Sequence, residues 1–274
     1  MKAGILISIT EIQQEHCYQT RGNKPVRVLC NDLNYYVCKY TTGAGFPYML
    51  FNEYIAACFL KIWNLPVPDF GFIQIKTEHV KQTGLPYHFF EKPCFGSLYL
   101  GELMGVDKFF LVEPLLKNVG EEGIFHFLKI ALFDIWMCNE DRHFENLNLL
   151  YDLKKNDFVP IDHAFCFNTN NLDKVPYLIS GNESLLDAPF LNRFFNRHLQ
   201  TKTEEIRLGI LYEFKNNCDA CYQQLDTILA GIPNEWHPDR QYLKERLAFL
   251  FDENWLIECQ HLFTRLFIQN LKPN

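Results

Sequence analysis

Residues 139–167 read NEDRHFENLNLLYDLKKNDFVPIDHAFCF and are the most informative stretch of the chain. Asp141 begins a D-R-H-x-x-N motif that ends at Asn146. The apolar run LNLLYD follows, then the polar turn LKKND, then a second apolar run that leads to Asp162. The sequence therefore predicts a short β-hairpin with an acid and an amide before it and a second acid after it.

An acid, an amide and a second acid around a hairpin are the groups that phosphoryl transfer uses. We expect Asp141 to be the catalytic base that accepts a proton from a hydroxyl group. Asn146 and Asp162 are expected to bind Mg²⁺ on the phosphates, because carboxylate and amide oxygens suit a hard cation. The alternative is an ordinary polar loop, since Asp and Asn favour turns for conformational reasons. The position of the whole pattern, between two apolar runs and just after a helix, favours the functional interpretation.

The composition is that of a globular protein. The chain has 274 residues, of which 48% are hydrophobic and 22% charged, and its net charge is −7. This charge argues against direct nucleic-acid binding, whose affinity depends on neutralising phosphates. No apolar run reaches the roughly 18–20 residues that cross a bilayer, and the apolar run near the N-terminus is too short for a secretion signal. We expect a cytoplasmic protein that does not associate with membranes.

The ten cysteines do not suggest a disulfide scaffold, because they are a small fraction of a long chain. Most lie in apolar segments, where Cys behaves as a small hydrophobic residue. Cys218 and Cys221 form the only C-x-x-C pair, and no second pair is present to complete a zinc site. Structural thiols are therefore expected, with a redox or metal role as the alternative.

The first ninety residues predict mainly strands, with one helix among them. Apolar residues at helical spacing indicate a helix in PYMLFNEYIAACFLKIWNL, residues 47–65. Four β-rich runs are expected as strands, the first two as a hairpin: VRVLC (26–30), YYVCKY (35–40), FGFIQI (70–75) and YHFFE (87–91). The segment KPCFGS, residues 92–97, is expected to be a break between two parts of the chain.

From about residue 120 the pattern becomes helical. Residues 121–140 predict a buried helix, and three or four further helices are expected between about 183 and 273. The sequence therefore predicts an α+β fold with two lobes: a strand-rich N-lobe, residues 1–93, on the nucleotide phosphate side, and a helical C-lobe, residues 94–274, with the catalytic loop, the metal site and a helical tail. Together they form one domain, and a ligand is expected between the lobes.

Lys39 is the candidate for a cation that the N-lobe supplies to the phosphates. It lies on the predicted strand 35–40, and Glu53 follows inside the predicted helix, where an ion pair between the two is plausible. A strand lysine that contacts nucleotide phosphates and pairs with a helix glutamate is the kinase arrangement. The alternative is a lysine that extends to solvent. Its order along the chain relative to the other candidates favours the phosphate role.

The loop CYQTRGNKP, residues 17–25, contains a single glycine, Gly22, and lacks a G-x-G-x-x-G motif. Thr20, Arg21 and Lys24 could contact phosphates with their side chains instead of backbone N–H groups. The loop could equally be an ordinary hairpin turn, and both interpretations remain open.

Two weaker expectations rest on position alone. Near the lobe boundary, the segment FFEKP could present backbone groups of Glu91 and Pro93 to an adenine edge. His143, two residues after the expected base, is expected to fix the loop by hydrogen bonding rather than to transfer protons.

The chain resembles the HipA-like family of bacterial kinases, which have a protein-kinase-like fold. The resemblance is carried by the order of Lys39 and Glu53 followed by NEDRHFEN and PIDH. The segment NEYIAACFLKIWNLPVPDFG is similar to the family's first helix, and LAGIPNEWHPDRQYLKERLAFL resembles the compact, stand-alone subgroup. The resemblance covers nearly the whole chain, and D-R-H-x-x-N is its most specific element.

This resemblance implies Asp141 as the base, Asn146 and Asp162 as Mg²⁺ ligands, and Lys39 with its partner Glu53 on the phosphates of ATP. The chain departs from longer HipA toxins because it lacks their additional N-terminal subdomain, a recognisable helix-turn-helix and a loop rich in glycine and serine. These departures put toxin activity and inhibition by loop autophosphorylation in doubt.

We therefore expect an ATP- and Mg²⁺-dependent kinase that transfers the γ-phosphate to a Ser or Thr hydroxyl group, most plausibly of a protein. One alternative is a kinase-fold binding or scaffold protein without turnover, which the unusual loop favours. Another is a small-molecule or lipid kinase, because phosphotransfer residues do not identify the owner of the hydroxyl group.

Overall fold

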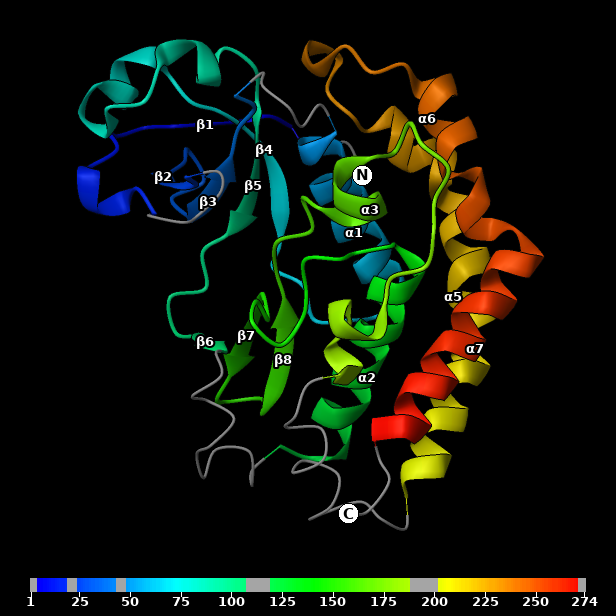
Figure 1. Ribbon diagram of the computed structural model, residues 1–274. Coiled ribbons are helices and arrows are strands. Elements are labelled where there is room, and N and C mark those ends of the chain that lie inside the picture. Colours follow the sequence, from blue (N-terminus) through cyan, green and yellow to red (C-terminus); the bar gives the residue numbers. More distant parts are fainter. Residues whose placement is uncertain (1–3, 19–23, 43–47, 107–118, 188–201, 271–274) are drawn as a thin grey trace.

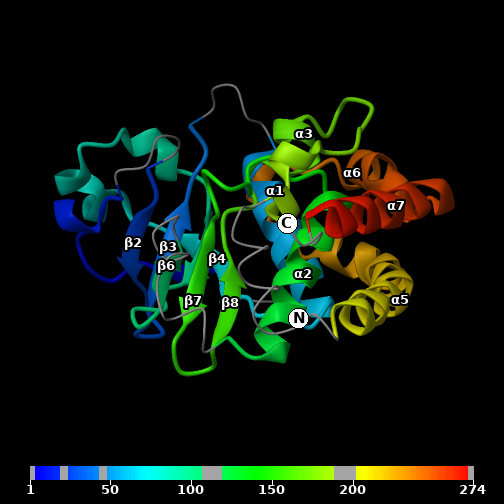
Figure 2. The same ribbon diagram turned by 60° about the horizontal axis from the view of Figure 1, so that its bottom comes forward.

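The computed structural model describes residues 4–18, 24–42, 48–106, 119–187 and 202–270. It contains a five-stranded sheet in the order β1-β4-β5-β3-β2 and a three-stranded sheet in the order β6-β7-β8. Figure 1 shows both sheets on one side of the molecule, α5 and α7 on the other, and α1 and α2 between them. Figure 2 shows the same layers after rotation. The α+β arrangement expected from the sequence is confirmed.

The five-stranded sheet belongs to the N-terminal part of the chain. Strand β5 lies at its centre and is antiparallel to β3 and β4, while β1 is parallel to β4. The predicted hairpin is confirmed, with Val26 opposite Cys38. The strands are β1 (Leu6–Ile7), β2 (Val26–Leu29), β3 (Tyr35–Lys39), β4 (Phe70–Gln74) and β5 (Cys94–Leu98).

Strand β5 corrects two expectations. The predicted strand 87–91 is wrong, because Tyr87–Phe90 form a 3₁₀ helix, and the predicted break at 92–97 contains the central strand instead. Gly96 is needed there, since a Cβ atom on it would collide with Cδ1 of Ile73 on β4. The expected lobe boundary after residue 93 thus lies before β5, and the N-terminal sheet continues to Leu98.

Helix α1 (Met49–Ile62) joins the two parts of the molecule. It is apolar on nearly all sides, as expected for a helix surrounded by protein, and ten of its residues are buried. Its C-cap residue Trp63 stacks on Trp136 at the end of α2 (Glu121–Trp136), with ring centroids 5.3 Å apart. This contact anchors α1 to the larger hydrophobic core. The described residues also form α5 (Thr203–Ala230), the shorter α6 (Arg240–Leu247) and α7 (Glu253–Asn270).

The three-stranded sheet carries the hairpin that the sequence predicts. Strands β7 (Leu149–Asp152) and β8 (Asp157–Pro160) pair antiparallel, and β6 (Met104–Val106) adds to β7. Asn156 in the turn adopts a left-handed conformation with φ 54°, which asparagine tolerates better than most residues. The hairpin therefore delivers the residues before β7 and after β8 to the same end of the sheet.

All ten cysteines are free thiols. Cys218 and Cys221 are buried on α5, and burial raises the pKa of both thiols, as expected for structural residues. Within the described parts of the chain, no helix is both long and apolar enough to cross a membrane.

Candidate active site

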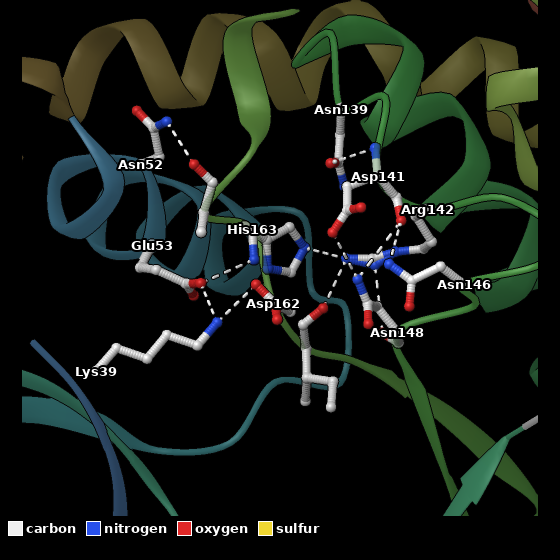
Figure 3. A network of polar contacts seen from close by, with 12 residues as sticks. Lys39, Asn52, Glu53, Asn139, Asp141, Arg142, Asn146, Asn148, Asp162 and His163 are labelled. Atoms are coloured by element: carbon white, nitrogen blue, oxygen red, sulfur yellow. Dashed lines mark hydrogen bonds and ion pairs between the residues drawn. The ribbon is translucent and has the colours of Figure 1, made fainter. Parts of the chain in front are cut away.

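Three charged side chains from separate elements meet at the centre of the site (Figure 3). The Lys39 ammonium, from β3, contacts Glu53 on α1 and donates to Oδ1 of Asp162 at 2.7 Å. The predicted ion pair between Lys39 and Glu53 is confirmed. The side chains of Lys39 and Glu53 are 13% and 5% exposed, whereas that of Asp162 is 38% exposed. The lysine and glutamate are therefore shielded, and the aspartate faces the open side.

Helix α1 also holds the backbone that follows Asp162. Oε1 of Glu53 accepts a hydrogen bond from the His163 N–H at 3.1 Å. The Asn52 side chain donates to the carbonyl oxygens of Ala164 at 2.9 Å and Cys166 at 3.3 Å. Asp162 itself has a left-handed backbone with φ 60°, which is uncommon for a residue other than glycine. These contacts fix the direction in which its carboxylate points.

The three charges shift one another's pKa values. Burial lowers the pKa of Lys39, but the carboxylates of Asp162 and Glu53 more than offset this and raise it above its ordinary value. Burial raises the pKa of Asp162, yet the ammonium of Lys39 brings it below the usual range. For Glu53 burial prevails, and its pKa is raised. At neutral pH the ammonium of Lys39 and the carboxylate of Asp162 are both charged.

The base loop, residues 137–147 between α2 and β7, carries the predicted base, Asp141. Backbone hydrogen bonds join His143 and Asn146 in both directions, at 3.1 and 2.9 Å, and Nδ1 of His143 accepts from the Glu145 N–H at 3.3 Å. The expected contribution of His143 to loop structure is confirmed by these contacts. The side-chain amide of Asn146 donates to the carbonyl oxygen of Asp141 at 2.9 Å. This tight turn brings the amide next to the expected base.

The Asp141 carboxylate is held by a residue that the sequence analysis did not select. Nδ2 of Asn148 donates to Oδ2 of Asp141 at 3.1 Å (Figure 3). Burial raises the pKa of Asp141, and so does the carboxylate of Asp162, while hydrogen bonds from Asn146 and Asn148 lower it. The net shift is upward. Asp141 and Asp162 are therefore close enough to influence each other's charge, as expected for two groups of one site.

Arg142, next to the expected base Asp141, is buried and connects separate parts of the site. Its guanidinium is fully buried and donates to Asp134 on α2 at 3.3 Å and to the Ile161 carbonyl at 3.0 Å. It also donates to Nε2 of His163 at 2.8 Å. Burial, followed by the nearby guanidinium, lowers the pKa of His163, so the imidazole is neutral and accepts this hydrogen bond. Arg142 thus joins the base loop to the segment that carries Asp162.

A left-handed turn closes the site on the side beyond His163. Phe167, Asn168 and Thr169 have φ values of 61°, 51° and 57° within α3 (Cys166–Asn170). Glu140, which precedes the expected base, accepts from the Asn168 side chain at 3.0 Å and from the Thr169 hydroxyl at 2.6 Å. The base loop and the segment after Asp162 are therefore bound directly to each other.

The expected adenine contact of Glu91 and Pro93 stays a prediction. Glu91 is exposed in the bend before β5, and none of the described hydrogen bonds or ion pairs joins it to the site. The Pro93 carbonyl accepts from the Trp236 indole at 2.7 Å. The link between the two sheets, residues 99–103, follows β5.

The expected phosphate loop is described only at its ends. Thr20, Arg21 and Gly22 lie outside the described residues. Lys24 is exposed, and its backbone carbonyl accepts from the hydroxyl group of Tyr40 at 2.9 Å.

The donors at Asn146 and Asp162 fit a Mg²⁺ ion. The amide nitrogen of Asn146 is bound to the Asp141 carbonyl, which leaves Oδ1 as the amide atom able to face a cation. Asp162 is the most exposed carboxylate of the ion-paired group. Mg²⁺ is usually bound by one or two protein oxygens together with phosphate oxygens and water. Asn146 and Asp162 would supply the two protein oxygens.

Comparisons with known proteins agree with this geometry. The model of the HipA-like kinase family matches residues 9–260. Among solved structures, the proinflammatory kinase CtkA of Helicobacter pylori has a similar fold: the TM-score is 0.58 at 15% sequence identity, over 98% of this chain and 100% of that chain. The two-lobed, kinase-like fold is thereby confirmed. A search of curated proteins gave no match. With the family model spanning most of its length, the chain belongs to the HipA-like kinase family.

Proposed function

We propose that the protein is an ATP- and Mg²⁺-dependent kinase that transfers the γ-phosphate to a Ser or Thr hydroxyl group of a protein. The observation that carries the proposal is the meeting of Lys39, Glu53 and Asp162 beside the loop of Asp141 and Asn146. These five residues come from four separate places in the chain: β3, α1, the loop between α2 and β7, and the segment after β8. A purely structural ion pair would not require the amide and the second carboxylate next to it.

Lys39 would neutralise charge on the nucleotide phosphates. Its ammonium is held between two carboxylates, so its position is set before a nucleotide binds. Glu53 holds the lysine side chain beside Asp162 and is itself fixed by the His163 N–H. Such prior positioning of charge is the largest source of catalysis in phosphoryl transfer.

Asn146 and Asp162 would hold Mg²⁺, as their oxygen donors suggest. When bound, the ion neutralises charge on the phosphates and orients the group that is transferred. The chain keeps the two oxygens in place. Asn146 is held by its hydrogen bond to the Asp141 carbonyl, and Asp162 is held because Asn52 on α1 binds the Ala164 carbonyl two residues further on.

Asp141 would accept the proton of the acceptor hydroxyl group. Its carboxylate lies in the base loop beside Asn146, within the electrostatic influence of Asp162. A raised pKa makes the carboxylate a better proton acceptor, provided that it stays ionised at the working pH. Membership of the HipA-like kinase family supports a Ser or Thr acceptor on a protein.

The proposal is tested with labelled ATP and Mg²⁺. The purified protein is incubated alone and with lysate proteins, and labelled products are hydrolysed to identify the phosphorylated amino acid. We expect phosphoserine or phosphothreonine with the wild type and none with Asp141→Asn. Label found only in lipid or small molecules would replace the protein acceptor with another. Nucleotide binding without any transfer would instead favour a scaffold role.

A further inference from the structure

Asn148 lies between the base loop and β7 in a conformation that restricts which residues can occupy it. Its backbone is left-handed, with φ 45°. Asparagine and glycine tolerate this region, whereas most other side chains are strained there. The conformation turns the Asn148 side chain back towards Asp141 instead of along the strand (Figure 3). A residue that served only to make the turn would need nothing beyond tolerance of the left-handed backbone.

The backbone of Asn148 is fixed by two other parts of the site. Its carbonyl oxygen accepts from the Ile161 N–H at 3.0 Å and lies 3.4 Å from Nη1 of Arg142. Ile161 directly precedes Asp162, and Arg142 directly follows Asp141. Asn148 is therefore tied to both halves of the site. None of these contacts requires a bound ligand, so the position of its side chain is set in advance.

The Asn148 amide contacts Asp141 twice. Nδ2 lies 3.1 Å from the carboxylate oxygen Oδ2 and 3.5 Å from the carbonyl oxygen. The first distance is that of a normal hydrogen bond, and a bond to a carboxylate is stronger than one between neutral groups. The bond fixes the position of Oδ2 and with it the orientation of the carboxylate.

We propose that Asn148 is a positioning residue, whose amide holds the Asp141 carboxylate in the orientation in which it accepts the proton of the phosphoryl acceptor. The inference rests on the proposed role of Asp141 as the base. It assigns to Asn148 a contribution that differs from that of Asn146, which is placed to bind the metal. The protein group that touches the reacting proton remains Asp141 alone.

Two substitutions separate positioning from backbone structure. Asn148→Gly removes the amide but keeps full tolerance of the left-handed backbone. Asn148→Asp keeps the size and shape of the side chain and replaces the donor with a second carboxylate. Asn156→Gly is the matched control, because Asn156 is also a left-handed asparagine, with φ 54°, whose side chain accepts from the Tyr151 hydroxyl away from the site.

The first measurement is labelled phosphate transfer as a function of pH, with the wild-type protein's own phosphorylation or its best acceptor as the substrate. For Asn148→Gly we expect kcat to fall roughly 10- to 100-fold, the effect of losing one hydrogen bond to a charged group, while KM for ATP stays unchanged. The acidic limb of the pH profile should move to higher pH, and further still for Asn148→Asp. Asn156→Gly should show neither change.

The second measurement follows Asp141 directly, by ¹³C NMR of its side-chain carboxyl group, assigned with Asp141→Asn. We expect the Asp141 titration to move to higher pH in Asn148→Gly and to stay in place in Asn156→Gly. An unchanged titration and an unchanged pH profile in a folded Asn148→Gly protein would overturn the role of Asn148 while leaving the kinase intact. A wild-type protein that binds ATP but transfers no phosphate would overturn the proposed function, and the positioning role with it.

Discussion

The Lys39 ammonium pairs with the carboxylates of Glu53 and Asp162, so replacing the lysine should change stability as well as activity. Glu53 is almost completely buried, and its pKa is raised by burial even with the ammonium beside it. Removing the lysine would leave this carboxylate without its main partner. Breaking a buried pair by removing one side is much more destabilising than replacing both sides.

Lys39→Met should therefore lower the free energy of unfolding at pH 7 by about 3 kcal/mol, as well as weaken transfer. The double variant Lys39→Met/Glu53→Gln should recover most of the stability but none of the activity. Lys61→Met is the control, since its partner Asp69 is 75% exposed and such surface pairs contribute less than about 1 kcal/mol. Urea unfolding measures all three. Equal losses for Lys39→Met and Lys61→Met would contradict the account.

The buried carboxyl group of Asp134 leads to a second prediction, about how the stability of the protein depends on pH. Burial raises its pKa to about 6 in spite of Arg142, from about 3.8 in the unfolded chain. Between these values the folded protein keeps a proton that the unfolded chain loses, so the stability this group contributes at low pH is lost as pH rises. The unfolding free energy of the wild type relative to Asp134→Asn should fall by about 2 kcal/mol from pH 4 to 6.

Urea unfolding at a series of pH values tests this. Asp219→Asn removes an exposed carboxylate from α5 and should leave the slope of the wild type unchanged. If the wild type and Asp134→Asn ran parallel across this window, the buried carboxyl would not titrate as described.

The sequence predicts the charged residues of the site but not the residues that hold them in place. Lys39, Glu53 and Asp162 stand at recognisable spacings on predicted elements, and the structure joins them. Arg142 could not be selected, because arginine is rarely buried and nothing in the order of residues indicates a cavity for it. The contact of Asn148 with Asp141 depends on a positive φ that the chain order does not reveal.

Among the elements, the β7–β8 hairpin was predictable, and β5 was not. The hairpin has two apolar runs around a polar turn, which is a local pattern. Strand β5 begins after Pro93 and contains Gly96, and both residue types are depleted in strands. The glycine is explained only by the close approach of Ile73 on the neighbouring strand, which is a property of the folded sheet.

Gly96→Ala should destabilise the protein by about 1–3 kcal/mol, because the added methyl group meets the buried Ile73 side chain. Ile73→Val removes the colliding Cδ1 atom and by itself costs about 1 kcal/mol. In the double variant the two costs should be less than additive, which thermal and urea unfolding would show. If the two costs were strictly additive, the contact with Ile73 would not be the reason for a glycine at position 96.

The left-handed turn of α3 is the second element whose conformation needs tertiary support. A left-handed conformation costs roughly 1–2 kcal/mol for each residue other than glycine, and three occur in succession. Asn168 offsets part of this cost. Its amide donates to Glu140 and to the Tyr177 carbonyl, both at 3.0 Å, and its oxygen accepts from the Tyr177 N–H at 3.0 Å.

Asn168→Ala should lower the free energy of unfolding by about 2–4 kcal/mol, because a buried side chain with three hydrogen bonds is lost from a strained backbone. It should also increase protease cleavage within residues 163–180. Asn171→Ala is the control: Asn171 donates a single hydrogen bond, to the Asn168 carbonyl, and has an ordinary φ of −99°. If the two variants lost equal stability, Asn168 would not be what holds the turn.

In the whole molecule, α1 is held by both lobes. Its Glu53 reaches the site, while the Tyr54 hydroxyl donates to the Ile228 carbonyl on α5 at 3.1 Å. The Phe72 ring on β4 packs against Tyr54, with centroids 5.1 Å apart. The helix that carries Glu53 is therefore fixed between the sheet and α5, and this sets the position of its ion pair with Lys39.

Under the proposed function, Asp141 acts on the acceptor and Asp162 acts on the metal and the nucleotide, and this difference between the two aspartates is testable. Calorimetric titration with ATP and Mg²⁺, beside labelled phosphate transfer, tests it in the wild type, Asp141→Asn and Asp162→Asn. We expect Asp141→Asn to bind nucleotide nearly as the wild type does and to lose transfer by about 10²–10⁴-fold, the usual contribution of a general base. Asp162→Asn should lose the Mg²⁺-dependent part of nucleotide binding. Equal loss of binding in both variants, or full transfer by Asp141→Asn, would contradict the account.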